Sequence, residues 1–253
     1  MPRIQIHPWL SAWDDILRNV SFFNSNFERW NTSGTGVFSD SPAASIGFTR
    51  LPQDAPILRQ VPDPSSGTKS AHMEMIFADG FASATNAPQP SNGSFISVDT
   101  AVVSPTSKGT VTLASRDPFT FPLINPSFLT TEFDVFAMTQ AVKDARTFMT
   151  SSTFTGLIAG RFGALGAAQT DEHIAVAARD SVASIFHPTS TACMSPKGAS
   201  WGVLDPDLRV KGVSGLRVVD ASVFPNIFAC HPTGVIYIVA ERTADLIKDT
   251  WGI

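Results

Sequence analysis

Two histidines, His187 and His231, each stand directly before a proline. An unperturbed imidazole titrates close to neutral pH, so it can accept a proton from a substrate hydroxyl group. Because proline restricts the backbone of the preceding residue, each ring sits on a stiff segment of chain. The residue types alone leave two interpretations open: a pair of proton-transfer groups, or two histidines that are hydrogen-bonded within the core.

Three other features could belong to a site. Asp220 ends a predicted strand eleven residues before His231 and is either a site residue or an ordinary cap. The two cysteines, Cys193 and Cys230, are too few for a disulfide scaffold or a zinc site. We expect both to be small buried hydrophobic residues, with a disulfide bond as the alternative. The run 205–207 (DPD) is interpreted as a turn, and we predict no metal site.

The elements that position these residues begin with a helix over residues 7–31, predicted from apolar residues at helical spacing. Strands are predicted at residues 72–77 and 94–103. The run 110–115 follows the second strand after a Pro/Gly turn, so we expect these two runs to form a hairpin.

A further helix should start at Thr130 or Thr131 and end before the Gly-rich stretch 156–167. Another is predicted from Asp171 to Ile185. A short strand at 216–220 and a helix at 235–247 complete the chain. This order of elements favours an α+β fold with an antiparallel sheet.

The composition excludes several classes of protein. The chain has 253 residues, of which 43% are hydrophobic and 16% charged, as in globular proteins. Its net charge of −4 indicates neither a nucleic-acid partner nor an anionic membrane surface. No apolar run approaches the length of a membrane span, and the first residues do not resemble a signal peptide. Three glycosylation sequons, at Asn19, Asn31 and Asn92, are compatible with a secreted protein.

Long ordered blocks of the last third carry a family resemblance. The blocks are FHPTSTACMSP, ASWGVLDPDLRVKGVSGLRVVDASVFP, the HPTG turn and VAERTADLIK. They resemble the C-terminal region of the glucose-methanol-choline (GMC) flavoprotein oxidoreductases, and most of all the fungal aryl-alcohol oxidases. Weaker similarity continues upstream through PDPSSGTKSAHMEMIF and GSFISVDTAVVSPTSKGTVTLAS, to about residue 50.

The resemblance implies a role for each matching residue. His187 matches the general base that takes the substrate hydroxyl proton, and His231 matches the second active-site histidine, which binds the alcohol and stabilises charge. The residues implied to contact FAD are Asp220, Ala221, Pro232 and Thr233. The residues implied to line the substrate site are Phe186, Phe81 and Glu74, of which Glu74 matches an active-site carboxylate that orients one histidine. Phe81 as a core residue and Glu74 as a solvated strand residue are the alternatives.

The resemblance also implies a domain organisation. Residues 1–180 would form a substrate-binding domain, an antiparallel sheet covered by helices. Residues 181–253 would contribute the histidines and flavin contacts to an incomplete FAD-binding domain. The family holds the FAD pyrophosphate on a G-x-G-x-x-G turn between a strand and a helix. The nearest run here, 34–36 (GTG), lacks the later glycine and the preceding strand. We therefore expect an N-terminal flavin-binding half to be a missing partner.

The predicted function is FAD-dependent oxidation of a primary, aromatic alcohol to an aldehyde with oxygen as acceptor. The resemblance also implies a secreted protein. Pro232 and Thr233 follow His231 where aryl-alcohol oxidases more often have Thr-Gln, which leaves the substrate preference open. Three alternatives remain for the chain itself: a truncated product that is inactive alone, a stand-alone module that binds aromatic alcohols, or a chain that binds FAD unaided.

Overall fold

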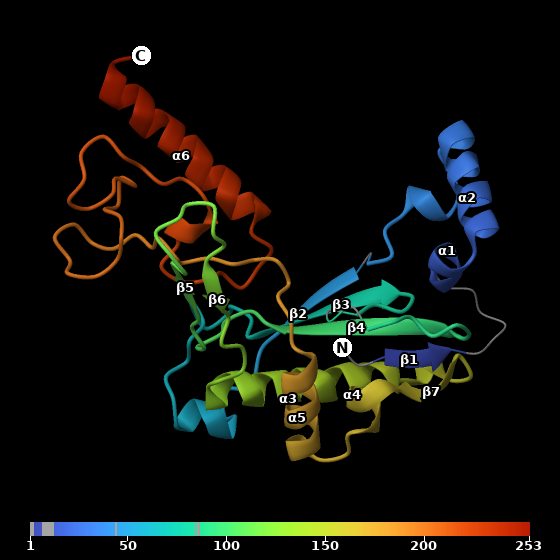
Figure 1. Cartoon of the computed structure of the whole chain (residues 1–253). Coiled ribbons are helices and arrows are strands. Elements are labelled where there is room, and N and C mark those ends of the chain that lie inside the picture. Colours follow the sequence, from blue (N-terminus) through green and yellow to red (C-terminus); the bar gives the residue numbers. More distant parts are fainter. Residues whose placement is uncertain (1–2, 7–12, 44, 84, 86) are drawn as a thin grey trace.

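A five-stranded antiparallel sheet forms the centre of the molecule, in the strand order β2-β3-β4-β1-β7 (Figure 1). The computed structural model describes residues 3–6, 13–43, 45–83, 85 and 87–253. The strands of this sheet are β1 (Arg3–Ile6), β2 (Ser45–Thr49), β3 (Met73–Asp79), β4 (Ser94–Val102) and β7 (Ile158–Phe162).

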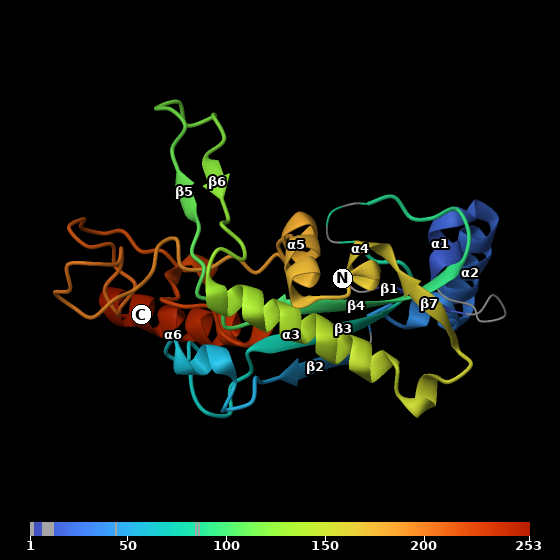
Figure 2. The ribbon, with the colours of Figure 1, turned by 90° about the horizontal axis from the view of Figure 1, so that it is seen from below.

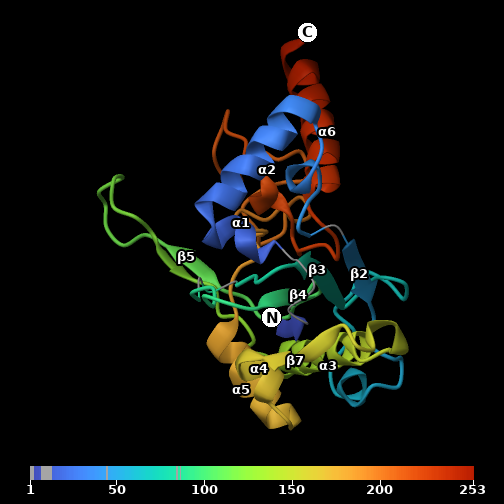
Figure 3. The ribbon, with the colours of Figure 1, turned by 90° about the vertical axis from the view of Figure 1, so that its right-hand side faces the viewer.

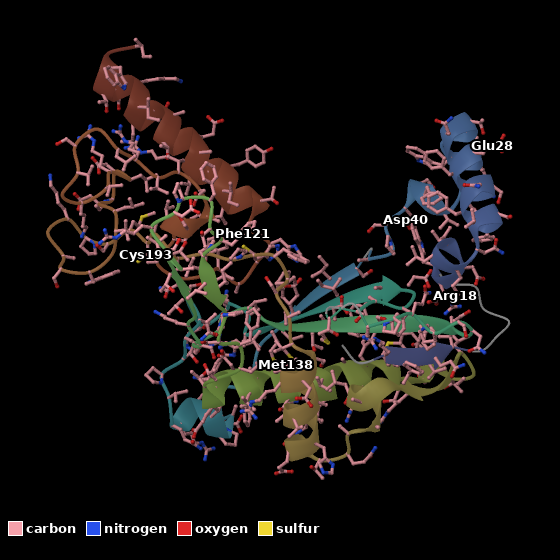
Figure 4. The ribbon with its side chains drawn as sticks, in the orientation of Figure 1. Arg18, Glu28, Asp40, Phe121, Met138 and Cys193 are labelled. Atoms are coloured by element: carbon pink, nitrogen blue, oxygen red, sulfur yellow. The ribbon has the colours of Figure 1, made fainter. Side chains whose placement is uncertain are left out.

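Three helices cover one face of the sheet: α3 (Glu132–Met149), α4 (Gly163–Ala167) and α5 (Asp171–Ser181) (Figures 1 and 2). On α3, Ala137, Ala141 and Ala145 recur every fourth residue and are all 0% exposed. Residues four apart share one helix face, and the small methyl groups let α3 approach the strands closely. Met138 of α3 lies beneath the sheet, where its sulfur accepts a hydrogen bond from Thr100 Oγ1 at 3.4 Å (Figure 4).

On the other side of the sheet, helices rise from its two ends. They are α1 (Asp14–Arg18) and α2 (Val20–Ser33) at one end and α6 (Thr233–Trp251) at the other (Figure 1). Figure 3 shows that all three lie on the side of the sheet away from α3. Asp14 anchors the first pair, since its buried carboxylate accepts hydrogen bonds from the backbone N–H groups of Phe81 (2.9 Å) and Phe95 (2.8 Å). Short 3₁₀ turns occur at η1 (Val37–Ser39), η2 (Pro56–Arg59), η3 (Ser152–Phe154) and η4 (Ala221–Val223).

A separate hairpin of β5 (Thr110–Thr112) and β6 (Leu123–Asn125) projects away from the body (Figure 2). The prediction that residues 94–103 pair with 110–115 is therefore wrong. β4 lies between β3 and β1, so neither of its edges is free for β5. The 110–115 run pairs with a later segment that has no clear strand pattern.

Two other predictions need correction. The helix at 7–31 is interrupted at Asn19, whose backbone is extended (φ −124°, ψ 102°) and whose side chain caps α2 through Phe22 N–H; residues 7–12 lie outside the described residues. The segment 216–220 makes only an isolated bridge between Arg209 and Arg217, and the predicted Gly-rich break contains β7.

The remaining elements are confirmed. β3 contains residues 73–77 of the predicted 72–77 strand, and α3 begins after Thr131, whose hydroxyl accepts a hydrogen bond from Asp134 N–H. α5 begins at Asp171 as predicted but ends at Ser181, short of Ile185, and α6 contains the predicted 235–247 helix. The α+β fold class with an antiparallel sheet is confirmed. Among the described residues, no helix has the length and hydrophobicity that crossing a bilayer requires.

Candidate active site

The structure brings His187 and His231 together. Their ring centroids are 4.9 Å apart, and the ring planes meet at 78°. His187 lies in the irregular segment after α5, and His231 lies just before α6, so each ring is carried by a loop next to a helix end. The interpretation of the pair as hydrogen-bonded core histidines does not hold for His231, because its side chain is 40% exposed.

A buried carboxylate completes this group. Glu74 of β3 is 2% exposed, and its Oε1 lies 2.6 Å from His231 Nε2. The interpretation of Glu74 as a solvated strand residue is therefore wrong. At this distance a proton lies between the two atoms, so the carboxylate fixes which way the His231 ring faces.

The sequence did not indicate which residues flank Glu74. The sheet register places it between Phe48 of β2 and Ala101 of β4, on the face opposite α3. Phe48 is 46% exposed, so an aromatic side chain lies open beside the carboxylate. The alternation of residues in the 45–49 strand, with Ile46 and Phe48 on one face, is the pattern from which this could have been predicted.

The environment of His187 lowers its pKa from the ordinary histidine value. Burial is the largest cause, and the charge of the His231 ring adds to it, while the Glu74 carboxylate acts in the opposite direction. A lowered pKa keeps the ring neutral near pH 7, and a neutral ring can accept a proton.

The backbone on either side of His187 is strained. Phe186 has a φ of 63° and Ser190 a φ of 75°, both in the left-handed region that side chains disfavour. Phe186 is also 90% exposed, so its ring does not pack on the histidines. Strained residues of this kind often occur at functional sites. The predicted contact of Phe186 with substrate stays a prediction.

The structure does not bring Phe81 to the histidines. It follows β3 at the end of the strand away from Glu74, and its ring packs at 5.5 Å from Phe95 and 6.3 Å from Phe162. The guanidinium of Arg3 lies 4.2 Å from the centre of the Phe81 ring. This packing matches the core alternative, and a role in substrate binding stays a prediction.

The four predicted flavin contacts lie in two adjacent segments. Asp220 Oδ1 caps η4 by accepting a hydrogen bond from Ser222 N–H at 2.7 Å, and Ala221 is the first residue of η4. Pro232 and Thr233 begin α6, and Val223 of η4 packs in one apolar cluster with α6. Asp220 is therefore a cap, and a flavin contact is compatible with this because the side chain is exposed.

The start of α6 could hold an electron-rich group. No side chain caps its first backbone N–H groups, which leaves donors at the positive end of a 19-residue helix. A Cβ placed on Gly234 would meet nothing within 4 Å, so the space beside these donors is open. These features fit the ring end of a flavin.

No comparable cradle exists for the pyrophosphate among the described residues. Gly34 ends α2 with a left-handed conformation, and Gly36 precedes η1. The segment therefore connects a helix to a 3₁₀ turn, whereas a dinucleotide site needs a strand followed by a helix.

The expectation of two buried cysteines is wrong for Cys230, which is exposed, and both thiols are free. Cys193 is half-buried in the loop region beside α6 (Figure 4).

Residues 105–240 match the family described as GMC oxidoreductase. A dehydrogenase, eriK, from Hericium erinaceus is 39% identical over 248 residues, which cover 94% of this chain and 40% of that protein. The chain thus spans about two fifths of the length of this relative.

Two solved structures show the same fold. A formate oxidase from Aspergillus oryzae, in which the effect of a mutation on FAD modification was studied, has a TM-score of 0.86 and 29% identity, covering 98% of this chain and 45% of that one. A fungal aryl-alcohol oxidase has a TM-score of 0.71 and covers 100% of this chain and 47% of its own. Its identity of 22% supports the fold alone.

Proposed function

The chain belongs to the GMC oxidoreductase family, and from this premise we propose that it provides the proton-transfer side of an FAD-dependent alcohol oxidase. The proposed reaction is the oxidation of a primary aromatic alcohol to its aldehyde, with oxygen as the electron acceptor. The observation that carries the proposal is the ordered set Glu74, His231 and His187, joined by a 2.6 Å hydrogen bond and a 4.9 Å ring contact.

In this proposal His187 is the general base. Its lowered pKa keeps a ring nitrogen unprotonated, and that nitrogen takes the proton from the substrate hydroxyl group. His231 binds the same oxygen from a second direction, and Glu74 holds the His231 ring in place. When bound, FAD supplies the acceptor for the hydride that leaves the carbinol carbon.

The residues that would hold the flavin ring are Asp220, Ala221, Pro232 and Thr233. Support comes from the open N-terminus of α6, whose donors suit the electron-rich edge of the ring. Residues 181–253 would thus contribute to flavin binding, and residues 1–180 would form the substrate-binding domain.

We propose further that the adenosine end of FAD is bound by a nucleotide-binding half, acting as a partner of the described residues. The exposed apolar side chains support this. Phe119 and Phe121 of the projecting hairpin are 92% and 90% exposed, and Tyr237 and Ile238 of α6 are each 69% exposed. Surfaces of this kind mark a protein interface.

Secretion as a glycoprotein is part of the same proposal. Its support is that Asn19, Asn31 and Asn92, the sequon residues, are all exposed. For the aromatic substrate, the support is the open Phe48 ring beside Glu74. Phe81 and Phe186 would contact substrate only if the proposed nucleotide-binding half brings the substrate to them.

A chimera tests the proposal. This chain replaces the matching 248 residues of the Hericium relative, and the purified chimera is examined for bound flavin and for peroxide release with an aryl alcohol. We expect a flavin spectrum and turnover. Replacing His187→Ala should lower turnover about 10²–10⁴-fold, the usual contribution of a general base. The matched control is His173→Ala, which removes an exposed histidine of α5.

Several outcomes discriminate between the alternatives. Full turnover by a flavin-loaded His187→Ala chimera would refute the proposed base. Turnover with a quinone acceptor but without peroxide release would show that a quinone, and not oxygen, is the electron acceptor. If this chain alone binds aryl alcohols and never binds flavin, the stand-alone binding module is the better description.

A further inference from the structure

A cavity of about 400 Å³ lies beside the loop that leads to His231. Its walls come from the end of β2, from the segment 50–71 and from the residues just before His231. The lining residues are Phe48, Thr49, Arg50, Ser66, Lys69, Ser70, Ala71, Phe228, Ala229 and Cys230. Its volume is within the range of small-molecule sites. Glu74, His187 and His231 do not line this cavity, although Phe48, the open ring beside Glu74, does.

The charged residues that line the cavity are all positive. Two cations, Arg50 and Lys69, line the cavity, and none of its ten lining residues is acidic. Arg50 is occupied, because it forms an ion pair with Asp63 and donates hydrogen bonds to Ser65 Oγ (2.7 Å) and the Ser70 carbonyl (2.6 Å). Lys69 is exposed, and none of the ion pairs among the described residues includes it. Its ammonium group is therefore available to an anion.

Hydroxyl groups lie beside the cations. Ser66 Oγ and Ser70 Oγ are 2.8 Å apart, so that one hydroxyl donates to the other and one proton remains to be donated. Thr49 Oγ1 is shielded from solvent and has no hydrogen-bond partner among the described residues. A lysine and several hydroxyls are the groups that recognise a carboxylate.

Two aromatic rings form the apolar part of the lining. Phe48 of β2 is 46% exposed, and Phe228 lies on the loop side. Aromatic walls of this kind bind a flat ring. We propose that this cavity binds an aromatic carboxylate, with its charge on Lys69 and the serine hydroxyls and its ring between Phe48 and Phe228. The proposal goes beyond the alcohol oxidation above, and its test needs no flavin.

Cys230 makes the site measurable. It is exposed, lines the cavity and directly precedes His231, so a ligand in the cavity should shield its thiol. Cys193 does not line the cavity and serves as an internal control. The experiment measures the alkylation rate of each cysteine in the full chain by peptide mass spectrometry, with benzoate as probe. Benzamide is the neutral matched compound, and inorganic phosphate is an anion without a ring.

We expect benzoate at ten times its Kd to slow alkylation of Cys230 about tenfold, because only the free form reacts. Alkylation of Cys193 should not change, and benzamide and phosphate should protect much less. Lys69→Gln should abolish the protection, while Lys197→Gln, at an exposed lysine outside the cavity, should retain it. Arg50 is left intact because its substitution would break the ion pair with Asp63.

Each contrary result overturns the proposal. Equal protection by benzamide would exclude recognition of the charge, and equal protection by phosphate would exclude recognition of the ring. Slower alkylation of both cysteines would indicate general binding to the chain, and protection that survives Lys69→Gln would exclude Lys69 as the anion contact. Failure of the proposed oxidation would leave these results unaffected, since no step of the experiment depends on flavin.

Discussion

His231 Nε2 lies 2.6 Å from Glu74 Oε1, although 157 residues separate the two in the chain. The contact joins strand β3 to the loop before the last helix, α6, and so it connects the sheet to the segment that carries His231. Because the carboxylate is 2% exposed, water cannot replace the imidazole as its hydrogen-bond partner. The position of the His231 ring and the stability of the fold are therefore linked.

The first prediction concerns this link. His231→Ala should lower the free energy of unfolding by about 1–3 kcal/mol, because it leaves the buried Glu74 carboxylate without a partner. The double variant Glu74→Gln/His231→Ala should recover part of the loss, since a neutral amide is less costly to bury than a charge. Urea unfolding measures both, with His173→Ala as the exposed control. Equal stability of the single and double variants would contradict the link.

The second prediction concerns the titration of His187. NMR titration of its ring should give a pKa below the ordinary histidine value, with burial as the main cause. His231→Ala should raise this pKa, because it removes a neighbouring positive charge. Glu74→Gln should lower it further, because it removes a negative charge that favours the protonated ring. A His187 pKa that is the same in all three proteins would show that the rings do not interact.

In the chimera the same shift has a kinetic consequence. The base must be neutral to act, so turnover should rise with pH through the lowered pKa of His187 and be complete by neutral pH. An acidic limb centred above the ordinary histidine value would contradict this assignment of the base.

The third prediction concerns Asp99 of β4, whose Oδ1 is buried with no hydrogen-bond partner among the described residues. Burial raises the pKa of Asp99 to about 6, and nearby positive charges, Arg3 among them, oppose the rise. The pKa of Asp99 is thus higher in the folded than in the unfolded protein. The stability that protonated Asp99 contributes to the fold is therefore fully present below about pH 4 and is lost as the pH rises through about 6.

Asp99→Asn should therefore stabilise the protein at pH 7, by on the order of 1–3 kcal/mol, and the gain should vanish near pH 4. Thermal unfolding across this pH range measures the effect. The control is Asp180→Asn, at an exposed position at the end of α5. A loss of stability at pH 7 in Asp99→Asn would mean that the carboxylate has a stabilising partner.

The fourth prediction concerns the projecting hairpin. Phe121→Ser should change the free energy of unfolding by less than about 0.5 kcal/mol, because the ring is 90% exposed. It should also lower the binding of an apolar dye and any self-association of the chain. Phe133→Ala, at a core position 1% exposed, should by contrast cost about 3–5 kcal/mol. A large loss in Phe121→Ser would show that the hairpin packs on the body.

Local patterns predicted the elements that depend on local forces. The β3 strand, the Thr131 cap of α3 and the start of α5 each follow from neighbouring residues. The pairing of strands was harder to predict from the sequence. β1 has only four residues and pairs with β4 and β7, which lie far from it in the chain, and β4 was expected to pair with residues 110–115. The energy of pairing depends on which strand is adjacent in space, and alternation within one strand does not specify it.

The sequence by itself determined the chemical groups of the site, the stiff proline turns after His187 and His231, and the family to which these blocks belong. Only the tertiary structure decided that the two rings touch, that Glu74 is buried against one of them, and that Phe81 lies elsewhere. The physical reason is distance along the chain. A contact between residues far apart in the chain forms only when the intervening chain folds, which costs conformational entropy. Every element that packs between the two residues contributes to offsetting that cost, so no local pattern predicts the contact.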